Sequence, residues 1–514
     1  MTDHESTAVT LIGLDGVSWA LIDDVTTHAD VPVLSSLVDE SVHGTTTSTI
    51  PSLTCPALPT LYTGKNPGNL GIFDFVKPDG SLVDYTDVTE PAVWDYLSDR
   101  DVSMVVGAMR TTHPAPRING VFISDVLSTA EEPDYVTPET AREYGDRFHE
   151  QRELLEAAKK EGPSPALLDA FIEMNNTRSD VFLALLDEYD PDFALLWFGL
   201  SDGVQHYFWD DPESLRTFFE AFDDRLGRIL DARSESNVVV VGDHGFGPAT
   251  KYRFHLNDVL HEGGYLTLQG GVARAAATKL SYRLSELYLD DRWKRRALDL
   301  VNRFKRDEPT DTESSSGRDR TVVSPLNTIP GIDWSETVAH VSTRKGWGIN
   351  LVEENIDGDP DELRDEIIEY ITQVTAPNGA PAIKDAWPGE EIYWGRYGDQ
   401  VPDIVYLAHD ELRVRPSVVG KRFTRHASSY VGTHESAREA VFMARGPDVV
   451  REEPVGAVEL YDIAPTLIHL TGNRIPETLD GEVVDLTSRP VTHGQYHTER
   501  YRIRNGLRAV SERL

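Results

Sequence analysis

The chain has 514 residues, of which 39% are hydrophobic, and its formal net charge at pH 7 is −37. A chain of this length exceeds the size of one compact core, so one large α/β domain with insertions and two separate domains are both open. A strongly acidic surface repels the phosphates of nucleic acids and of anionic membranes, which excludes both as bulk partners.

Cysteine usage and the first residues indicate the compartment. Cys55 is the only cysteine, so no disulfide forms within the chain, which is typical of a reducing compartment. The first residues, MTDHESTAV, lack the basic and apolar regions of a signal peptide. No apolar run approaches the ~20 residues that span a bilayer. We therefore expect a cytoplasmic protein that is not inserted in a membrane.

The acidic residues are accompanied by few lysines, because arginine far outnumbers lysine. This composition resembles that of proteins from extreme halophiles, in which molar salt shortens the screening length to ~3 Å and weakens the repulsion between like charges. An acidic enzyme from a mesophile is the alternative. Neither interpretation bears on the fold.

Short apolar runs alternate with helical patterns along the chain. Runs of this length, apolar without interruption, are typical of strands that are buried on both faces of a sheet. The alternation predicts an α/β fold with a mostly parallel central sheet and helices on both faces. Predicted strands lie at 8–14, 42–49, 101–109, 191–200, 237–241 and 439–447, and predicted helices at 31–41, 92–100, 215–233, 361–374 and 460–472.

Composition divides the chain into three predicted parts. Residues 1–260 form the first part of an α/β catalytic core, with a helical insertion at about 131–190. Residues 261–420 form a variable, cap-like region, in which the polar stretch at about 306–321 reads as a mobile loop. Residues 421–514 close the core.

Carboxylates and imidazoles follow three of the predicted strands. Asp15 follows the first strand, Asp202 and His206 follow the strand at 191–200, and Asp243 and His244 follow the strand at 237–241. Ligands bind at the carboxyl ends of strands in open α/β sheets, so we expect these side chains to converge. Taken singly, an Asp-Gly turn explains Asp15, and an ion pair or a helix cap explains Asp202 and His206.

These residue types also indicate which ion would bind. Asp and His side chains with no second cysteine suit zinc or manganese, and not a thiolate or iron–sulfur site. Two such ions about 3.5–4 Å apart activate a hydroxyl and stabilise both oxygens of a phosphoryl displacement. We therefore expect two divalent metal ions, with zinc first and manganese as the alternative.

The stretch at 50–75, IPSLTCPALPTLYTGKNPGNLGIFDF, places Ser52, Thr54 and Cys55 together. A hydroxyl is a poor nucleophile at neutral pH unless a base or a metal takes its proton. With LDG at 14–16, SDGVQHYFW, GDHGFGP and GTH at 432–434, this stretch resembles the type I phosphodiesterase/nucleotide pyrophosphatase family of the alkaline phosphatase superfamily. Later segments extend the resemblance over nearly the whole chain; these are GWGINL, DIVYL, FMARGP, YDIAPTLIHLTG and LDGEVV.

The resemblance implies a role for each matching residue. Thr54 corresponds to the nucleophile. One metal ion would be bound by Asp15, Thr54, Asp243 and His244, and the other by Asp202, His206 and His434. His434 is assigned by the resemblance alone, because the sequence THES fits any polar turn.

A sulfatase is the less favoured relative. In sulfatases the modified nucleophile begins a Cys-x-Pro-x-Arg pattern, and a Thr-Gly pair follows nine residues later. Counting back from Thr63 gives Thr54 and not Cys55, and Leu58 stands where the arginine would be. Family members of the eukaryotic type also carry an asparagine three residues after the nucleophile, where this chain has Ala57.

The expected activity is hydrolysis of a small phosphoester substrate through a phosphothreonine intermediate. A diester is favoured, since no arginine lies in the motif around Thr54 to balance a monoester dianion. A phosphomonoesterase and a phosphotransferase or phosphomutase remain alternatives. The aromatic residues Tyr207, Phe208 and Trp209 would line a leaving-group pocket, stack on a base, or belong to the core. The sequence does not predict the oligomeric state.

Overall fold

The computed structural model describes residues 7–77, 81–125, 134–269, 331–341, 347–426, 430–496, 498, 501 and 503. The chain forms two units. The first consists of Met1–Thr250, Tyr393–Gln400 and Ser428–Leu514, and the second of Lys251–Ile392 and Val401–Ala427. The loop predicted at 306–321 lies outside the described residues, and the three-part division made from the sequence stays a prediction.

The first unit is built on a nine-stranded sheet. Only β17 and β5 run antiparallel to their neighbours, so the prediction of a mostly parallel sheet is confirmed. The order across the sheet is β18 (Gly456–Glu459), β2 (Val42–Thr47), β17 (Glu439–Arg445), β7 (Asn237–Val241), β1 (Val9–Leu14), β6 (Phe193–Phe198), β3 (Met104–Met109), β4 (Gly120–Ser124) and β5 (Val136–Thr137).

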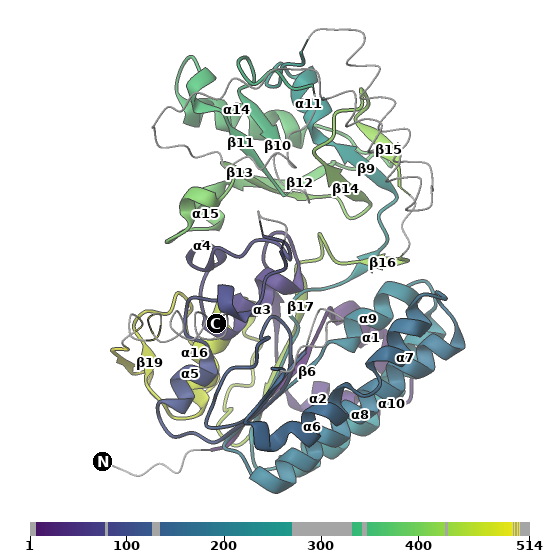
Figure 1. Cartoon of the computed structure of the whole chain (residues 1–514), viewed down its shortest axis with the longest axis vertical. Coiled ribbons are helices and arrows are strands. Elements are labelled where there is room, and N and C mark those ends of the chain that lie inside the picture. Colours follow the sequence, from purple (N-terminus) through teal and green to yellow (C-terminus); the bar gives the residue numbers. More distant parts are fainter. Residues whose placement is uncertain are drawn as a thin grey trace. The chain divides into compact units, whose positions relative to one another are not determined.

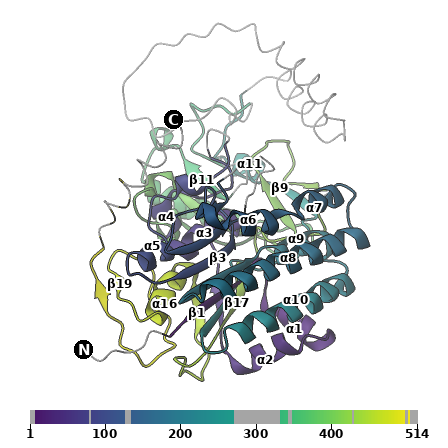
Figure 2. The same ribbon diagram turned by 60° about the horizontal axis from the view of Figure 1, so that its bottom comes forward.

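The central strands are apolar because both of their faces are covered. Every residue of β1, β6 and β7 is buried. Helices α1 (Trp19–His28), α2 (Pro32–Glu40), α8 and α10 lie on one side of the sheet, and α3, α5 (Val93–Ser98) and α16 (Ile463–Leu470) on the other (Figures 1 and 2). The predicted helices on both faces are therefore present.

The two long helices show why these segments are helical. In α10 (Pro212–Ala232), the side chain of Asp211 accepts a hydrogen bond from the Ser214 N–H, and proline occupies the first turn, where no donor is needed. In α8 (Pro165–Tyr189), Ser164 caps the helix in the same way. The two helices pack along each other, and the shorter α6 (Arg142–His149) and α7 (Arg152–Lys159) pack against α8 (Figure 2).

The second unit has its own sheets and its own hydrophobic core. One sheet has the order β10 (Ala339–Val341), β11 (Gly348–Leu351), β13 (Ile404–Ala408) and β12 (Ile383–Pro388), and a three-stranded sheet has the order β14 (Leu412–Arg415), β9 (Tyr252–His255) and β15 (Phe423–Arg425). The described part of this unit also contains helices α11 (Leu256–Glu262), α14 (Pro360–Thr372) and α15 (Gly389–Ile392), and α14 matches the predicted helix. None of the helices in the described part of the chain combines the length and apolar character that crossing a bilayer requires.

Gly13 allows the close packing of β1 against β6. Gly13 pairs with Trp197 in the register of the two strands, and a Cβ at Gly13 would lie 1.9 Å from the Trp197 ring. We predict that Gly13→Ala lowers the free energy of unfolding by ~3 kcal/mol, because the ring has to move within a closely packed core. Denaturant unfolding at fixed salt measures this change.

Gly398→Ala is the matched control. It lies in the same unit, and a Cβ there meets no heavy atom within 4 Å. Equal unfolding midpoints for the two variants would contradict the packing argument.

Candidate functional site

Three adjacent parallel strands deliver the predicted carboxylates to one edge of the sheet. The strand β1 lies between β7 and β6, so their carboxyl ends meet. Asp15 directly follows β1, and Asp243 and His244 follow β7. Asp202 lies in the first turn of α9 (Leu200–Phe208), after β6, and His206 lies one turn later on the same helix. The expected convergence is therefore present.

A fourth segment brings His434 to the same place. The short strand β16 (Gly432–Thr433) pairs with β8 (Gly247–Pro248). His434 directly follows β16, and His244 lies three residues before β8. The rings of His434 and His244 stack at a centroid distance of 4.0 Å. Thr54 is the first residue of α3 (Thr54–Thr63), and its Oγ1 lies 3.1 Å from Nε2 of His244. All seven predicted site residues thus belong to one cluster in the first unit.

Asp15 and Asp243 each have one oxygen fixed by a hydrogen-bond donor, and all three carboxylates have one oxygen left over. The Trp197 Nε1–H donates to Asp15 Oδ2 at 3.1 Å, and the Gly16 N–H donates to Asp243 Oδ1 at 3.2 Å. The other oxygens are buried and, in the described part of the chain, have no hydrogen-bond partner; these are Asp15 Oδ1, Asp202 Oδ1 and Asp243 Oδ2. Buried acceptors without a donor are costly, so this arrangement requires something positive between them.

The three histidines face these oxygens with their acceptor nitrogen. Nδ1–H of each ring donates to a backbone carbonyl, that of Gly432 for His206, Gly245 for His244 and Ser52 for His434. A carbonyl only accepts, so Nδ1 holds the hydrogen of the neutral ring and Nε2 presents a lone pair. Histidines that bind metal ions typically donate their other ring N–H in this way, which fixes the orientation of the ring.

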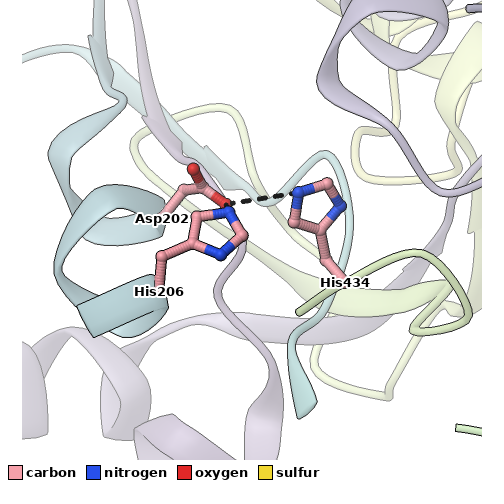
Figure 3. A group of neighbouring side chains, drawn as sticks. All are labelled: Asp202, His206 and His434. Atoms are coloured by element: carbon pink, nitrogen blue, oxygen red, sulfur yellow. Dashed lines mark ion pairs between the residues drawn. The ribbon is translucent and has the colours of Figure 1, made fainter. Parts of the chain in front are cut away.

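Histidine Nε2 atoms and carboxylate oxygens, which are both hydrogen-bond acceptors when the rings are neutral, therefore lie close to one another. His206 Nε2 and His434 Nε2 lie 3.5 and 3.7 Å from Asp202 Oδ1 (Figure 3). His244 Nε2 lies 3.6 Å from Asp15 Oδ1 and 3.4 Å from Asp243 Oδ2. A cation between these atoms would satisfy all of them at once, which a hydrogen bond cannot do.

The ligand atoms form two overlapping groups. Asp202, His206 and His434 form one, with ligand atoms within 4.8 Å of one another, as in the predicted set. Asp15, Asp202 and His244 form the other, so Asp202 belongs to both. The prediction for this second ion contained Asp243 and Thr54 in place of Asp202. The assignment of each ligand to one ion stays a prediction.

Burial and like charge act on the ionisable groups of the cluster. Burial raises the pKa of Asp15 well above its usual range, and the neighbouring Asp243 raises it further. Burial also raises the pKa of Asp243. Burial and the neighbouring His244 lower the pKa of His434 well below its usual range, so its ring is neutral at pH 7. A divalent cation would relieve the repulsion and favour the ionised carboxylates.

Arg110 belongs to the site, although the sequence analysis missed it. It directly follows β3, and its Nη1 lies 3.2 Å from Asp15 Oδ2 and 3.8 Å from Asp202 Oδ2. Its Nε lies 3.5 Å from Asp125 Oδ2, and its Nη2 donates to the carbonyl of Gly199. Its position directly after a predicted strand, the same feature that indicated Asp15, could have identified it. The prediction included only the acidic residues and histidines at strand ends.

Asp125 supports Arg110 from the next strand. It directly follows β4, and Arg178 of α8 donates to it through both terminal nitrogens, at 2.8 and 3.3 Å. The positive charges of Arg178 and Arg110 outweigh the effect of burial and hold the pKa of Asp125 below its usual range. Five neighbouring parallel strands, from β7 to β4, are thus each followed by a charged residue that takes part in this network.

A sequence model of the type I phosphodiesterase/nucleotide pyrophosphatase family matches residues 9–421. The chain belongs to this family. The family is part of the alkaline phosphatase superfamily, its members are phosphoester hydrolases, and they depend on divalent metal ions. No match was found among curated proteins.

Several solved structures of low sequence identity are similar to the chain. Phosphonoacetate hydrolase from Sinorhizobium meliloti 1021, in complex with phosphonoformate, is 17% identical with a TM-score of 0.50, over 91% of this chain and 95% of that chain. Murine ectonucleotide pyrophosphatase/phosphodiesterase 5, in an inactive form with AMP, is 14% identical with a TM-score of 0.47, over 95% and 97%. At such identities, the similarity to phosphonoacetate hydrolase concerns the fold alone.

The shared position of Asp202 in both ligand groups leads to a prediction about metal content. We expect Asp202→Asn to weaken the binding of both ions by ~100-fold or more, since a direct ligand matters at least as much as the outer partners of a metal site. His206→Asn removes a member of only one group and should lower the occupancy of one ion. Metal analysis after gel filtration measures the bound ions per chain.

Asp211→Asn serves as the control, because Asp211 caps α10 and is not part of the cluster. If Asp202→Asn binds as much metal as the parent protein, the cluster is not a metal centre.

Proposed function

We propose that the protein is a phosphodiesterase/nucleotide pyrophosphatase that uses two divalent metal ions, zinc or manganese, and a phosphothreonine intermediate on Thr54. One observation supports this proposal above the others. The Thr54 hydroxyl is buried at the start of a helix, 3.1 Å from Nε2 of His244. That nitrogen lies 3.6 Å and 3.4 Å from the unpartnered oxygens of Asp15 and Asp243. Hydroxyl, carboxylate and imidazole groups in this arrangement suit phosphoryl transfer.

The donor set fits the implied ions. Their ligands would be Asp15, Thr54, Asp243 and His244 for one, and Asp202, His206 and His434 for the other. Asp202 also groups with Asp15 and His244, so it would adjoin both ions. When bound, the ions supply positive charge that lowers the pKa of the Thr54 hydroxyl, stabilises the leaving oxygen and activates water. Oxygen and nitrogen donors without thiolate favour zinc or manganese.

The chain's own residues position the nucleophile. Thr54 Oγ1 lies 3.1 Å from Nε2 of His244, which places the oxygen within the cluster. Ala57 stands where related enzymes have an asparagine, so the backbone N–H of Cys55, in the first turn of α3, is the protein donor that we assign to a phosphate oxygen. Arg110 fixes the second oxygens of Asp15 and Asp202, which keeps their free oxygens directed at the imidazoles.

The proposed reaction has two displacements. Oγ1 of Thr54 loses its proton and attacks phosphorus, the bond from phosphorus to the leaving oxygen breaks, and that oxygen takes up a proton. A water molecule then attacks the phosphothreonine, the bond from phosphorus to Oγ1 breaks, and the threonine hydroxyl is restored. One water molecule is consumed for each ester bond cleaved.

Hydrolysis of bis-p-nitrophenyl phosphate tests the proposal. The assay is run in molar salt with added zinc or manganese, beside p-nitrophenyl phosphate and p-nitrophenyl sulfate. We expect the diester to be cleaved fastest, and Thr54→Ala to lower its turnover by about a thousandfold or more, because the attacking oxygen is missing. Rapid quenching and mass spectrometry should detect the phosphoryl group on the peptide that contains Thr54.

Thr60→Ala is the matched control. Thr60 lies on the same helix, and its hydroxyl donates to the carbonyl of Pro56, within α3. This variant should keep its activity. Unchanged turnover in Thr54→Ala would exclude Thr54 as the nucleophile, and cleavage of the sulfate alone would indicate a sulfatase.

A phosphomonoesterase is the second candidate, and Arg110 is the observation that favours it. A guanidinium that is only 17% exposed, beside Asp15 and Asp202, would balance the extra charge of a monoester dianion, which the sequence alone did not offer. Each of its three nitrogens already contacts Asp15, Asp125 or Gly199, which leaves the diester favoured.

The effect of Arg110→Met decides between the two. If the guanidinium only positions carboxylates, the variant should lower turnover of mono- and diester by similar factors, on the order of tenfold. If it binds the dianion, kcat/KM for the monoester should fall by at least a further tenfold. The ratio of the two kcat/KM values, measured in parent and variant, separates these outcomes.

A further inference from the structure

A cavity of about 330 Å³ opens beside the Asp202 and His206 side of the cluster. Of the seven site residues, Asp202 and His206 line it, whereas Thr54, Asp15 and His244 do not. Its lining joins residues that lie far apart in the sequence, all within the first unit. They are Arg110, Glu156, Lys159, Lys160, Asp202, Gly203, His206, Tyr207 and Tyr430.

The cavity is cationic within a strongly acidic protein. Lysines are few in this chain, yet Lys159 and Lys160 are consecutive at the end of α7, and both line the cavity with Arg110. Lys159 pairs with Glu156 at 2.9 Å, whereas Lys160 is exposed and has no carboxylate partner in the described part of the chain. The lining also holds the carboxylates of Glu156 and Asp202, and Arg110 is paired with Asp15, so Lys160 is the cation left to attract an anionic group, with Lys159 beside it.

Two tyrosines line the cavity next to these charges. Tyr207 and Tyr430 meet edge to face at a centroid distance of 5.4 Å, and Tyr430 also contacts the ring of His206 at 4.8 Å. The side chain of Tyr430 is 44% exposed, so part of it is open to a ligand. Of the aromatic run considered in the sequence, Phe208 is buried in the core and Trp209 packs on Phe246, which leaves Tyr207 for the cavity.

We propose that this cavity binds the leaving part of the substrate, and that this part is a ring-bearing alcohol with a second anionic group, held by Lys159 and Lys160. The inference rests on the proposed function. In an in-line displacement, the leaving oxygen departs on the side opposite the nucleophile. Thr54 lies with His244, and the cavity lies with Asp202 and His206, which is the side that the leaving oxygen would occupy.

Two chromogenic diesters test the proposal. One is methyl p-nitrophenyl phosphate, and the other is the same diester with a carboxylate next to the nitro group. We expect Lys159→Met/Lys160→Met to lower kcat/KM for the carboxylated diester by about fivefold to tenfold, the size of two partly exposed charge contacts, and to leave the uncharged leaving group unaffected. All assays use the same salt, because screening weakens such contacts.

Lys77→Met is the control for loss of a positive charge. Lys77 lies in the same unit, pairs with Asp87 and does not line the cavity. This variant should keep the ratio of the two kcat/KM values of the parent protein. Equal ratios in the parent and in the double lysine variant would overturn the proposal.

Direct binding gives a readout that does not depend on turnover. Isothermal titration calorimetry compares p-nitrophenol with its carboxylated form on the parent and on the double lysine variant. If the carboxylated form binds the parent protein more tightly than p-nitrophenol does, and this difference is reduced in the variant, the result supports the cavity as its binding site. If neither diester is cleaved while this binding is observed, the proposed function alone has failed. Identical binding of the carboxylated form to both proteins excludes the lysines as its site.

Discussion

The buried carboxylates of Asp15, Asp202 and Asp243 repel one another at the edge where parallel strands end, and burial makes that repulsion strong. The surrounding donors do not remove it. They fix one oxygen of each carboxylate through Trp197, Arg110 and Gly16, and leave the other oxygen facing a histidine lone pair. A cation at the centre of this site would relieve the repulsion, so the free-energy cost of burying these carboxylates favours binding of a cation.

The sequence predicted those parts of the site that follow from local patterns. The apolar runs of β1, β6 and β7 indicated strands, and their ends indicated Asp15, Asp202 and Asp243, because side chains at neighbouring strand ends must meet. His434 could not be found in this way. It reaches the cluster through the short pairing of β16 with β8, a contact between distant segments that no local pattern encodes.

The charged residues that support the site are also brought together by contacts between distant segments. Arg110 and Asp125 follow strands β3 and β4, but the strand order that places them beside Asp15 is a property of the folded sheet. The sequence analysis did not identify β4 at all. Lys159 and Lys160 were not predicted either, because only the folded structure brings the end of α7 to the cavity that residues of α9 also line. Helix and strand positions were thus largely predictable, whereas the neighbours of each charge were not.

The antiparallel strand β17 has a consequence for the order in which the site can be assembled during synthesis. Within the sheet, β2, which leads into the helix of Thr54, is joined to the ligand-bearing strands only through β17. Residues 439–445 leave the ribosome almost four hundred residues after β2. A growing chain can therefore align β7, β1 and β6 early, while the strand that leads to Thr54 joins their sheet only when translation is nearly complete.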